Sequence, residues 1–412
     1  MVVMGGIIGS GIFVTPAIVA RSVHSTAFIL GAWLIGGVAA ILGAMVYAEL
    51  SARRPDVGGQ YAYLREAYHP AAAFLYGWAL LLVIQTGGMA TSAITFARYF
   101  GQLARIGIGE GALAASVVAV LTLINCFGVA AGSRLQSALM LLRIAALFGL
   151  IVCGLAAGAA PPPQLPASDG PVALGAALVP VLFAYGGWQT ACFVAGEMKE
   201  PRRDLPRALL LGVAGVITLY TLIAFVCVRA LGAEGMARST APALDVIRRV
   251  LGERGAAVLG AGIAISTLGF LSQSILTAPR VYFAMAEDGV FFRSVASVHP
   301  LTRAPVVAIA LQGVLTIVIA LAGTYEVILG YMVAIDFIFF ALTAGCIFVF
   351  RRREPQAPYL MPGHPATTLV FIAICAAVVL STFARDLRHA LLGLGITLSG
   401  LPVFALWRRK AA

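Results

Sequence analysis

Apolar stretches of about 20 residues recur along the whole chain, and each can cross a hydrocarbon core of about 30 Å. Short polar segments separate them. Because 61% of the residues are hydrophobic and only 11% are charged, against roughly 25% charged in an average soluble domain, the sequence excludes a water-soluble fold. The pattern predicts a single transmembrane domain over residues 1–412.

The transmembrane segments are expected to be helical. Backbone polar groups in lipid must be paired internally, and a β-barrel would show short alternating segments in place of these continuous apolar runs. We therefore predict an all-α integral membrane protein with about twelve transmembrane helices. They are expected at residues 1–20, 26–52, 71–100, 112–128, 135–156, 172–198, 206–230, 255–285, 304–323, 327–350, 367–384 and 388–408.

The net charge of +11 would also suit a nucleic acid partner, so the placement of the basic residues decides its meaning. With the N-terminus inside, 17 of the 28 lysine and arginine residues fall in cytoplasmic loops and the C-terminal tail, as the positive-inside rule expects. We predict a multi-pass protein of the lipid bilayer with both termini cytoplasmic and no nucleic acid partner. Arginine outnumbers lysine 26 to 2, which favours a bacterial inner membrane.

Motifs for cofactor, metal or enzymatic chemistry are not found. The six cysteines occur singly in apolar stretches, and the five histidines lie in or near loops without metal-ligand spacing. There is no nucleophile elbow, phosphate-binding loop or HExxH motif at a credible place. We expect no metal, no cofactor and no enzymatic activity.

Two of the expected helices are interrupted by flexible residues, at Gly9–Gly11 in the first and at Tyr185–Trp188 in the sixth. Taken singly, either interruption is also consistent with close helix packing at glycines. The two breaks lie 176 positions apart, and the same offset places the stretch 26–52 over 206–230. This correspondence indicates an internal repeat.

Each repeat would contain five spans, and an odd number of spans makes the second copy enter the membrane in the opposite direction. We expect a first repeat over 1–156, an inverted second repeat over 172–350 and two additional helices over 367–408.

The breaks predict a binding site, because unpaired backbone at membrane depth is tolerated only where it is buried or lines a cavity. Free N–H groups beside Gly9, Ser10 and Gly11, at the positive start of the following half-helix, suit a carboxylate. Free carbonyl groups near Phe183 and Ala184 suit an ammonium group. A compound with both groups on one carbon is an α-amino acid.

At these residues the sequence resembles the amino acid, polyamine and organocation transporter superfamily, in particular its L-type amino acid transporter branch. The resemblance covers nearly the whole chain. Its motifs are Gly9–Phe13, the run from Phe183 to Pro206, Ala278–Arg280 followed by Asp288-Gly289, and Arg351–Pro355. It implies a leucine-transporter-like fold and secondary transport of amino acids by alternating access, either as a sodium-independent exchanger or as a proton-coupled permease.

The resemblance also implies which residues bind the substrate: the first break holds the carboxylate and the sixth-helix break holds the amino group. The residues implied are Gly9, Ser10, Gly11, Ile12, Phe183, Ala184, Gly186, Gly187, Trp188 and Gln189. No acidic residue stands out near the breaks, so we predict neutral amino acids as substrates. The alternatives are a carrier of cationic amino acids or polyamines, and a sensor that does not transport.

Charged residues within apolar stretches are costly and suggest function. Arg143 lies where similar transporters carry a lysine in place of a sodium ion. Because arginine does not deprotonate in proteins, we predict that Arg143 is a fixed cation. It would either tether neighbouring helices or snorkel to the membrane interface. Asp336 is predicted either to exchange protons or to accept a structural hydrogen bond. Glu49, Glu197 and Arg280 are predicted as cytoplasmic gate residues or simple structural anchors.

The first break lies close to the chain start. Only eight residues precede Gly9, and at 1.5 Å per residue they span about 12 Å. This is short for a half-helix with a cytoplasmic start, so we expect the natural protein to begin upstream of Met1.

Overall fold

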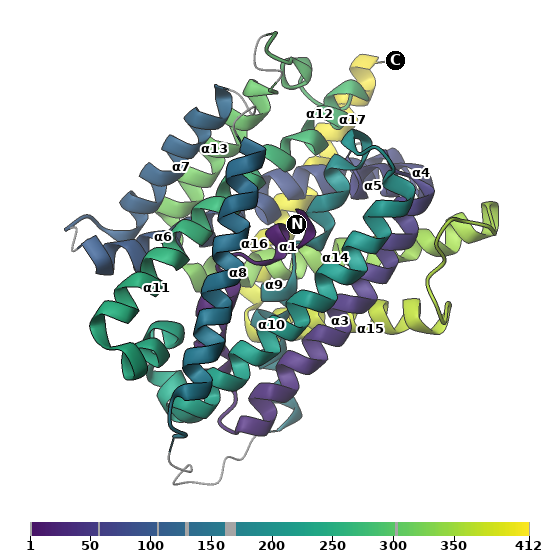
Figure 1. Cartoon of the computed structure of the whole chain (residues 1–412). Coiled ribbons are helices and arrows are strands. Elements are labelled where there is room, and N and C mark those ends of the chain that lie inside the picture. Colours follow the sequence, from purple (N-terminus) through teal and green to yellow (C-terminus); the bar gives the residue numbers. More distant parts are fainter. Residues whose placement is uncertain are drawn as a thin grey trace.

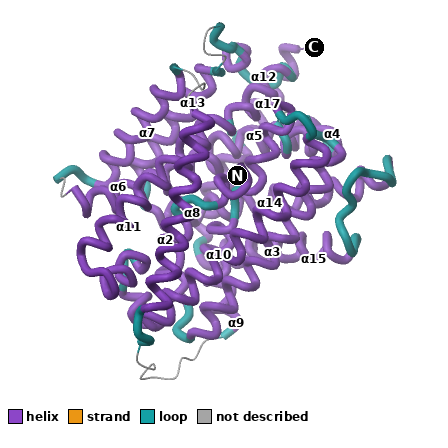
Figure 2. Tube along the Cα trace, in the orientation of Figure 1, coloured by secondary structure: helices purple, strands orange, loops and turns teal. Residues whose placement is uncertain are grey.

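The computed structural model describes residues 2–56, 58–104, 107–127, 132–160, 170–300 and 304–411. This part of the chain is helical and contains no strand (Figure 2). Eight helical segments are long and apolar enough to cross a membrane, and four shorter apolar helices accompany them. The prediction of an all-α membrane protein is confirmed.

The helices follow one another in the order labelled in Figure 1. The first part of the chain contains α1 (Val2–Ile7), α2 (Gly11–Ser22), α3 (Thr26–Arg53), α4 (Gln60–Ala67), α5 (Pro70–Ala79), the π-helical turn η1 (Leu80–Ile84), α6 (Gln85–Ala104), α7 (Glu110–Cys126) and α8 (Gly132–Ala156). The second part contains α9 (Pro171–Tyr185), the 3-10 helix η2 (Trp188–Glu197), α10 (Pro201–Arg238), α11 (Pro242–Thr277), α12 (Pro279–Glu287), η3 (Arg293–Ala296), α13 (Val306–Ala322) and α14 (Tyr325–Arg353). Three helices end the chain: α15 (Ala366–Arg385), α16 (Leu387–Leu398) and α17 (Gly400–Ala411).

Helices from the two parts of the chain pack in pairs. Helix α3 runs along α10, α7 along α13, and α6 along α11 (Figure 1), while α2 packs against α9. Small residues permit this close approach: a Cβ atom at Gly37 of α3 would lie 2.9 Å from the Ile217 side chain of α10. Trp33 of α3 packs edge-on against Tyr185 and Tyr220, with ring centroids 5.6 and 5.9 Å away. This packing holds both helix breaks in the centre of the bundle.

The sequence prediction is wrong for two segments that it left as loops. Most of 231–254 is helical, because α10 continues to Arg238 and α11 begins at Pro242. The chain changes direction at Gly232 (φ 70°) and Gly252 (φ 66°), where glycine adopts a left-handed conformation at no steric cost. The other segment is α4, whose side chains are mostly buried.

Candidate functional site

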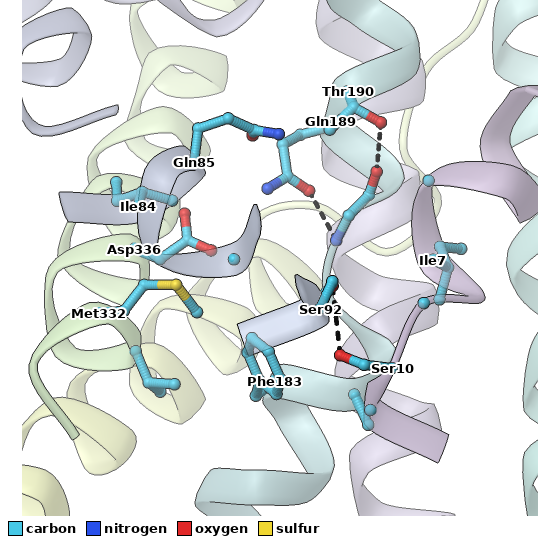
Figure 3. A pocket seen from close by; sticks show the side chains of 18 of the residues that line it. Ile7, Ser10, Ile84, Gln85, Ser92, Phe183, Gln189, Thr190, Met332 and Asp336 are labelled. Carbon is cyan, nitrogen blue, oxygen red and sulfur yellow. Dashed lines mark hydrogen bonds between the residues drawn. The ribbon is translucent and has the colours of Figure 1, made fainter. Parts of the chain in front are cut away.

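The first break separates α1 from α2 in the middle of the bundle. Helix α1 ends at Ile7 and α2 begins at Gly11. Between them, the N–H group of Gly9 donates to the carbonyl oxygen of Ile7 at 2.8 Å. The Ser10 hydroxyl lies 3.2 Å from the Ser92 hydroxyl of α6 (Figure 3). The first turn of α2 therefore presents N–H groups without helical partners and a partial positive charge at the break.

The second break separates α9 from η2. Helix α9 ends at Tyr185, and Gly187 has a left-handed backbone with φ 111°. Side chains of the following turn hold this glycine in place (Figure 3): the Gln189 Oε1 atom accepts from the Gly187 N–H at 3.0 Å, and the Thr190 hydroxyl donates to the Gly187 carbonyl at 2.7 Å. The carbonyl groups that end α9 carry the partial negative charge of a helix C-terminus.

The two breaks touch each other, and glycine is needed at the contact. A Cβ atom at Gly187 would lie 2.1 Å from the carbonyl oxygen of Gly6, and one at Gly11 would lie 2.8 Å from the Cα atom of Ala184. Real Cβ atoms essentially never approach other atoms so closely. The positive start of α2 and the negative end of α9 are consequently brought side by side.

A cavity opens where the breaks meet (Figure 3). Of the predicted substrate-binding residues, the ones that line it are Gly9, Ser10, Gly11, Phe183, Ala184, Gly186, Gly187 and Gln189. Ile12 and Trp188 do not line it. Ile12 points into the core and is 1% exposed, and the Trp188 ring stacks on Phe340 at 5.2 Å.

Helix α6 contributes a wall of the cavity that the sequence analysis missed. Gln85, Gly88 and Ser92 line the cavity at the spacing of one helix face. The first of them, Gln85, follows directly after the π-helical turn η1. Such turns are often found at functional sites. The signal that could have found them is this run of polar and small residues inside an otherwise apolar segment.

Helix α14 contributes Met332 and Asp336 to the same cavity (Figure 3). The expectation that no acidic residue lies near the breaks is therefore wrong. Asp336 and the two breaks are far apart in the sequence. Helix α14 packs against α6 and α9, so one turn of α14 faces both breaks. Within the described residues, the Asp336 carboxylate makes no hydrogen bond or ion pair.

Arg143 of α8 lies beside the first break, outside the cavity lining. Its guanidinium is buried and donates to the carbonyl oxygens of Gly5, at 3.3 Å, and of Ile8, and to that of Ser266 in α11. The Tyr220 hydroxyl donates to the carbonyl of Ile7 at 3.1 Å. Carbonyl groups at a helix C-terminus lack helical partners and favour a nearby cation. Arg143 thus links α8 to the end of α1 and to α11.

Glu49 is the centre of a buried ion-pair cluster where α3 and α14 end. Its carboxylate, which is 0% exposed, pairs with Arg53 at 2.8 Å and Arg351 at 2.6 Å. It also accepts from the backbone N–H of Met361 at 2.7 Å. The cluster fixes the loop after α14 onto α3.

A second group of contacts surrounds the end of α12. Asp288 pairs with Arg65 of α4 and accepts from the Tyr61 hydroxyl at 2.7 Å. Arg280 donates to the Leu276 carbonyl one turn earlier in the chain. The side chain of Glu197 lies outside the described part of the structure.

At the surface nearby, Arg54 joins two carboxylates. It pairs with Glu66 and with Glu354, each at 2.7 Å. Hydrogen bonding to Arg54 lowers the pKa of the Glu354 carboxyl. Within the described residues, no group of three or more His, Cys, Asp or Glu residues could hold a metal ion.

Comparison with known proteins gives matches along the whole chain. Residues 1–393 match the model of a family described as amino acid permease. The chain is 31% identical to the serine/threonine exchanger SteT of Bacillus subtilis, over 100% of this chain and 95% of that protein. It is 28% identical to the large neutral amino acids transporter small subunit 2 of Homo sapiens, over 99% of this chain and 79% of that protein. It is 27% identical to the Asc-type amino acid transporter 1 of Mus musculus, over 99% of this chain and 80% of that protein.

Proposed function

The chain belongs to the amino acid permease family, whose members are membrane transporters and not enzymes, and on this premise we propose that it exchanges neutral amino acids by alternating access without sodium. The observation that carries the proposal is the cavity between the two helix breaks, which offers opposite partial charges side by side. The names of two relatives support the finer assignment, since one is an exchanger of serine and threonine and another transports large neutral amino acids.

The substrate's zwitterion fits the cavity in one orientation. Its carboxylate would accept hydrogen bonds from the N–H groups of Ser10 and Gly11 at the start of α2, where the helix dipole favours an anion. Its ammonium group would lie against the carbonyl groups that end α9, near Phe183, Ala184 and Gly186. The substrate side chain would then point across the cavity toward α6 and α14.

The helix pairing supports an inverted repeat of the leucine-transporter-like type within twelve transmembrane spans. In the proposed scheme, residues 1–156 and 172–350 are the two repeats and 367–408 forms two additional helices. Repeat mates would be α3 with α10, α6 with α11, and α7 with α13, and each of these pairs is in contact. Binding sites at repeat interfaces are typical of such transporters.

We place the protein in a bacterial inner membrane with both termini in the cytoplasm. Helices α3 and α14 end in arginine clusters at the same end of the bundle, joined through Glu49. By the positive-inside rule, this end would face the cytoplasm. There, Glu49, Glu197 and Arg280 would anchor the segments that close the inner side of the cavity.

Arg143 would act as a permanent cation at the end of α1, in the place that a sodium ion would otherwise fill. An arginine stays protonated in proteins, so this site would not exchange protons. The driving force would accordingly come from amino acid exchange, unless Asp336 carries protons.

The proposal is tested by counterflow in sodium-free proteoliposomes. Uptake of labelled serine, threonine, alanine and leucine would be measured with and without unlabelled amino acid inside, at equal pH and with an inward proton gradient. Stimulation by internal amino acid supports the exchanger. Stimulation by the proton gradient alone would show a proton symporter, and binding without uptake under any condition would show a sensor.

A further inference from the structure

Among the described residues, two polar side chains that face the cavity, Gln85 and Asp336, have no hydrogen-bond partner. Gln85 of α6 is 8% exposed, and within the described residues its side-chain amide makes no hydrogen bond. Asp336 of α14 is partly buried, and within the described residues its carboxylate makes no hydrogen bond or ion pair. Buried polar groups are normally satisfied, because leaving one unpaired is costly. Two unpaired polar groups that face one cavity indicate that a ligand supplies their partner.

The other polar side chains that line the cavity each make at least one contact within the protein. Gln189 accepts from the Gly187 N–H, Thr190 donates to the Gly187 carbonyl, and Ser10 and Ser92 contact each other. These groups hold the breaks in place.

The unpaired groups lie on the side of the cavity away from the first break. In Figure 3, Asp336 and Gln85 come from the α14 and α6 walls, with Met332 and Ile84 beside them, while Ser10 and Ile7 lie opposite. A substrate held by its carboxylate at Ser10 would direct its side chain toward this wall. The apolar neighbours would contact its carbon atoms.

We propose that Asp336 and Gln85 form a side-chain subsite that selects neutral amino acids carrying a hydrogen-bond donor, a hydroxyl or a carboxamide, over aliphatic ones of the same shape. A carboxylate accepts hydrogen bonds, and a glutamine amide both donates and accepts. A hydroxyl or carboxamide can donate to Asp336 and accept from Gln85 at once. The inference rests on the proposed function for the position of the substrate backbone.

The test uses pairs of amino acids that differ in the donor and hardly in shape: threonine with valine, and asparagine with leucine. Each would compete against labelled serine in counterflow. Because a hydrogen bond to a charged group is strong, and a carboxylate left unpaired beneath an apolar substrate side chain is costly, threonine and asparagine should compete about 10- to 100-fold better than their partners. The ligand-dependent rise in Tm of the purified protein reports the same preference without transport.

Three variants separate the subsite from a structural role. Asp336→Leu should reduce the threonine-to-valine ratio to about 1 or below, and Asp336→Asn, which keeps an acceptor oxygen, should retain part of it. Asp386→Asn is the matched control, because this carboxylate pairs with His389 at the start of α16 outside the cavity of the breaks; the ratio should stay at the wild-type value.

The inference is overturned if valine and leucine compete as well as threonine and asparagine, or if Asp336→Leu leaves the ratio unchanged. It is also overturned if lysine or ornithine competes more strongly than both neutral donors, since the subsite would then serve cations. In these cases amino acid exchange itself persists, so the proposed function stands apart from the inference. Absence of both exchange and ligand-dependent stabilisation would instead refute the proposed function together with the inference.

Discussion

A methyl group at Gly187 would separate the two helix breaks. In Gly187→Ala, the new Cβ atom would start 2.1 Å from the Gly6 carbonyl oxygen. To reach 3.0 Å, below which such contacts essentially do not occur, the backbone segments must part by about 0.9 Å. The alanine would also have to keep φ near 111°, a conformation that residues with a side chain rarely adopt.

Both effects are unfavourable. Overpacking a tight contact costs about 1–3 kcal/mol, and a non-glycine residue in such a backbone conformation costs about 1–3 kcal/mol more. The displacement occurs where the substrate zwitterion would be held. A shift of about 1 Å in a positioning element can reduce a rate by about 100-fold, so we expect exchange to fall by roughly this factor.

The assay is counterflow with serine in proteoliposomes, beside thermal unfolding of the detergent-purified protein. The control is Gly31→Ala in α3, where an added Cβ atom would meet nothing within 4 Å; it should match the wild type in rate and keep or slightly raise Tm. Wild-type exchange by Gly187→Ala would refute the reasoning that the contact between the breaks sets the substrate site.

Further variants test the buried charges. Arg143→Met would leave helix-end carbonyls without donors, so exchange should fall at least about tenfold with a lower Tm, and Arg143→Lys should recover part of both; equal loss in the two variants would argue against a cationic role. Glu49→Gln would leave two arginines without their carboxylate, and should destabilise the protein by about 3–5 kcal/mol in thermal unfolding. Glu253→Gln, which removes the 79% exposed partner of Arg248, should change stability by less than about 1 kcal/mol, and a similar effect of both variants would contradict the structural role of the Glu49 cluster.

The helix breaks could be predicted from local sequence because glycine clusters in long apolar runs are a local signal. Both interruptions are present in the structure, after Ile7 and after Tyr185. The loop expected at 231–254, between the segments 206–230 and 255–285, is mostly helical in the structure. Gly232 and Gly252 each make only a single turn between helical segments there.

The cavity walls beyond the breaks could not be predicted in the same way. Whether Asp336 faces the substrate depends on the rotation of α14 about its axis, which is set by packing against α6 and α9 and not by the pattern within α14. Likewise, the π-helical turn before Gln85 shifts the face of α6 that follows it. Such shifts arise from tertiary packing, and the apolar pattern along the chain does not predict them.

The most direct test of the account asks whether a transported amino acid occupies the cavity between the breaks. Gly88→Cys places a thiol on the cavity wall, where a Cβ atom would meet only the Met332 sulfur at 3.9 Å. The partly exposed Cys126 and Cys153 would first be replaced by alanine. We predict that an exchanged L-amino acid slows labelling of this thiol by a small maleimide, while its D-enantiomer does not. If an amino acid that the same variant exchanges leaves the rate of maleimide labelling unchanged, the transport site lies elsewhere.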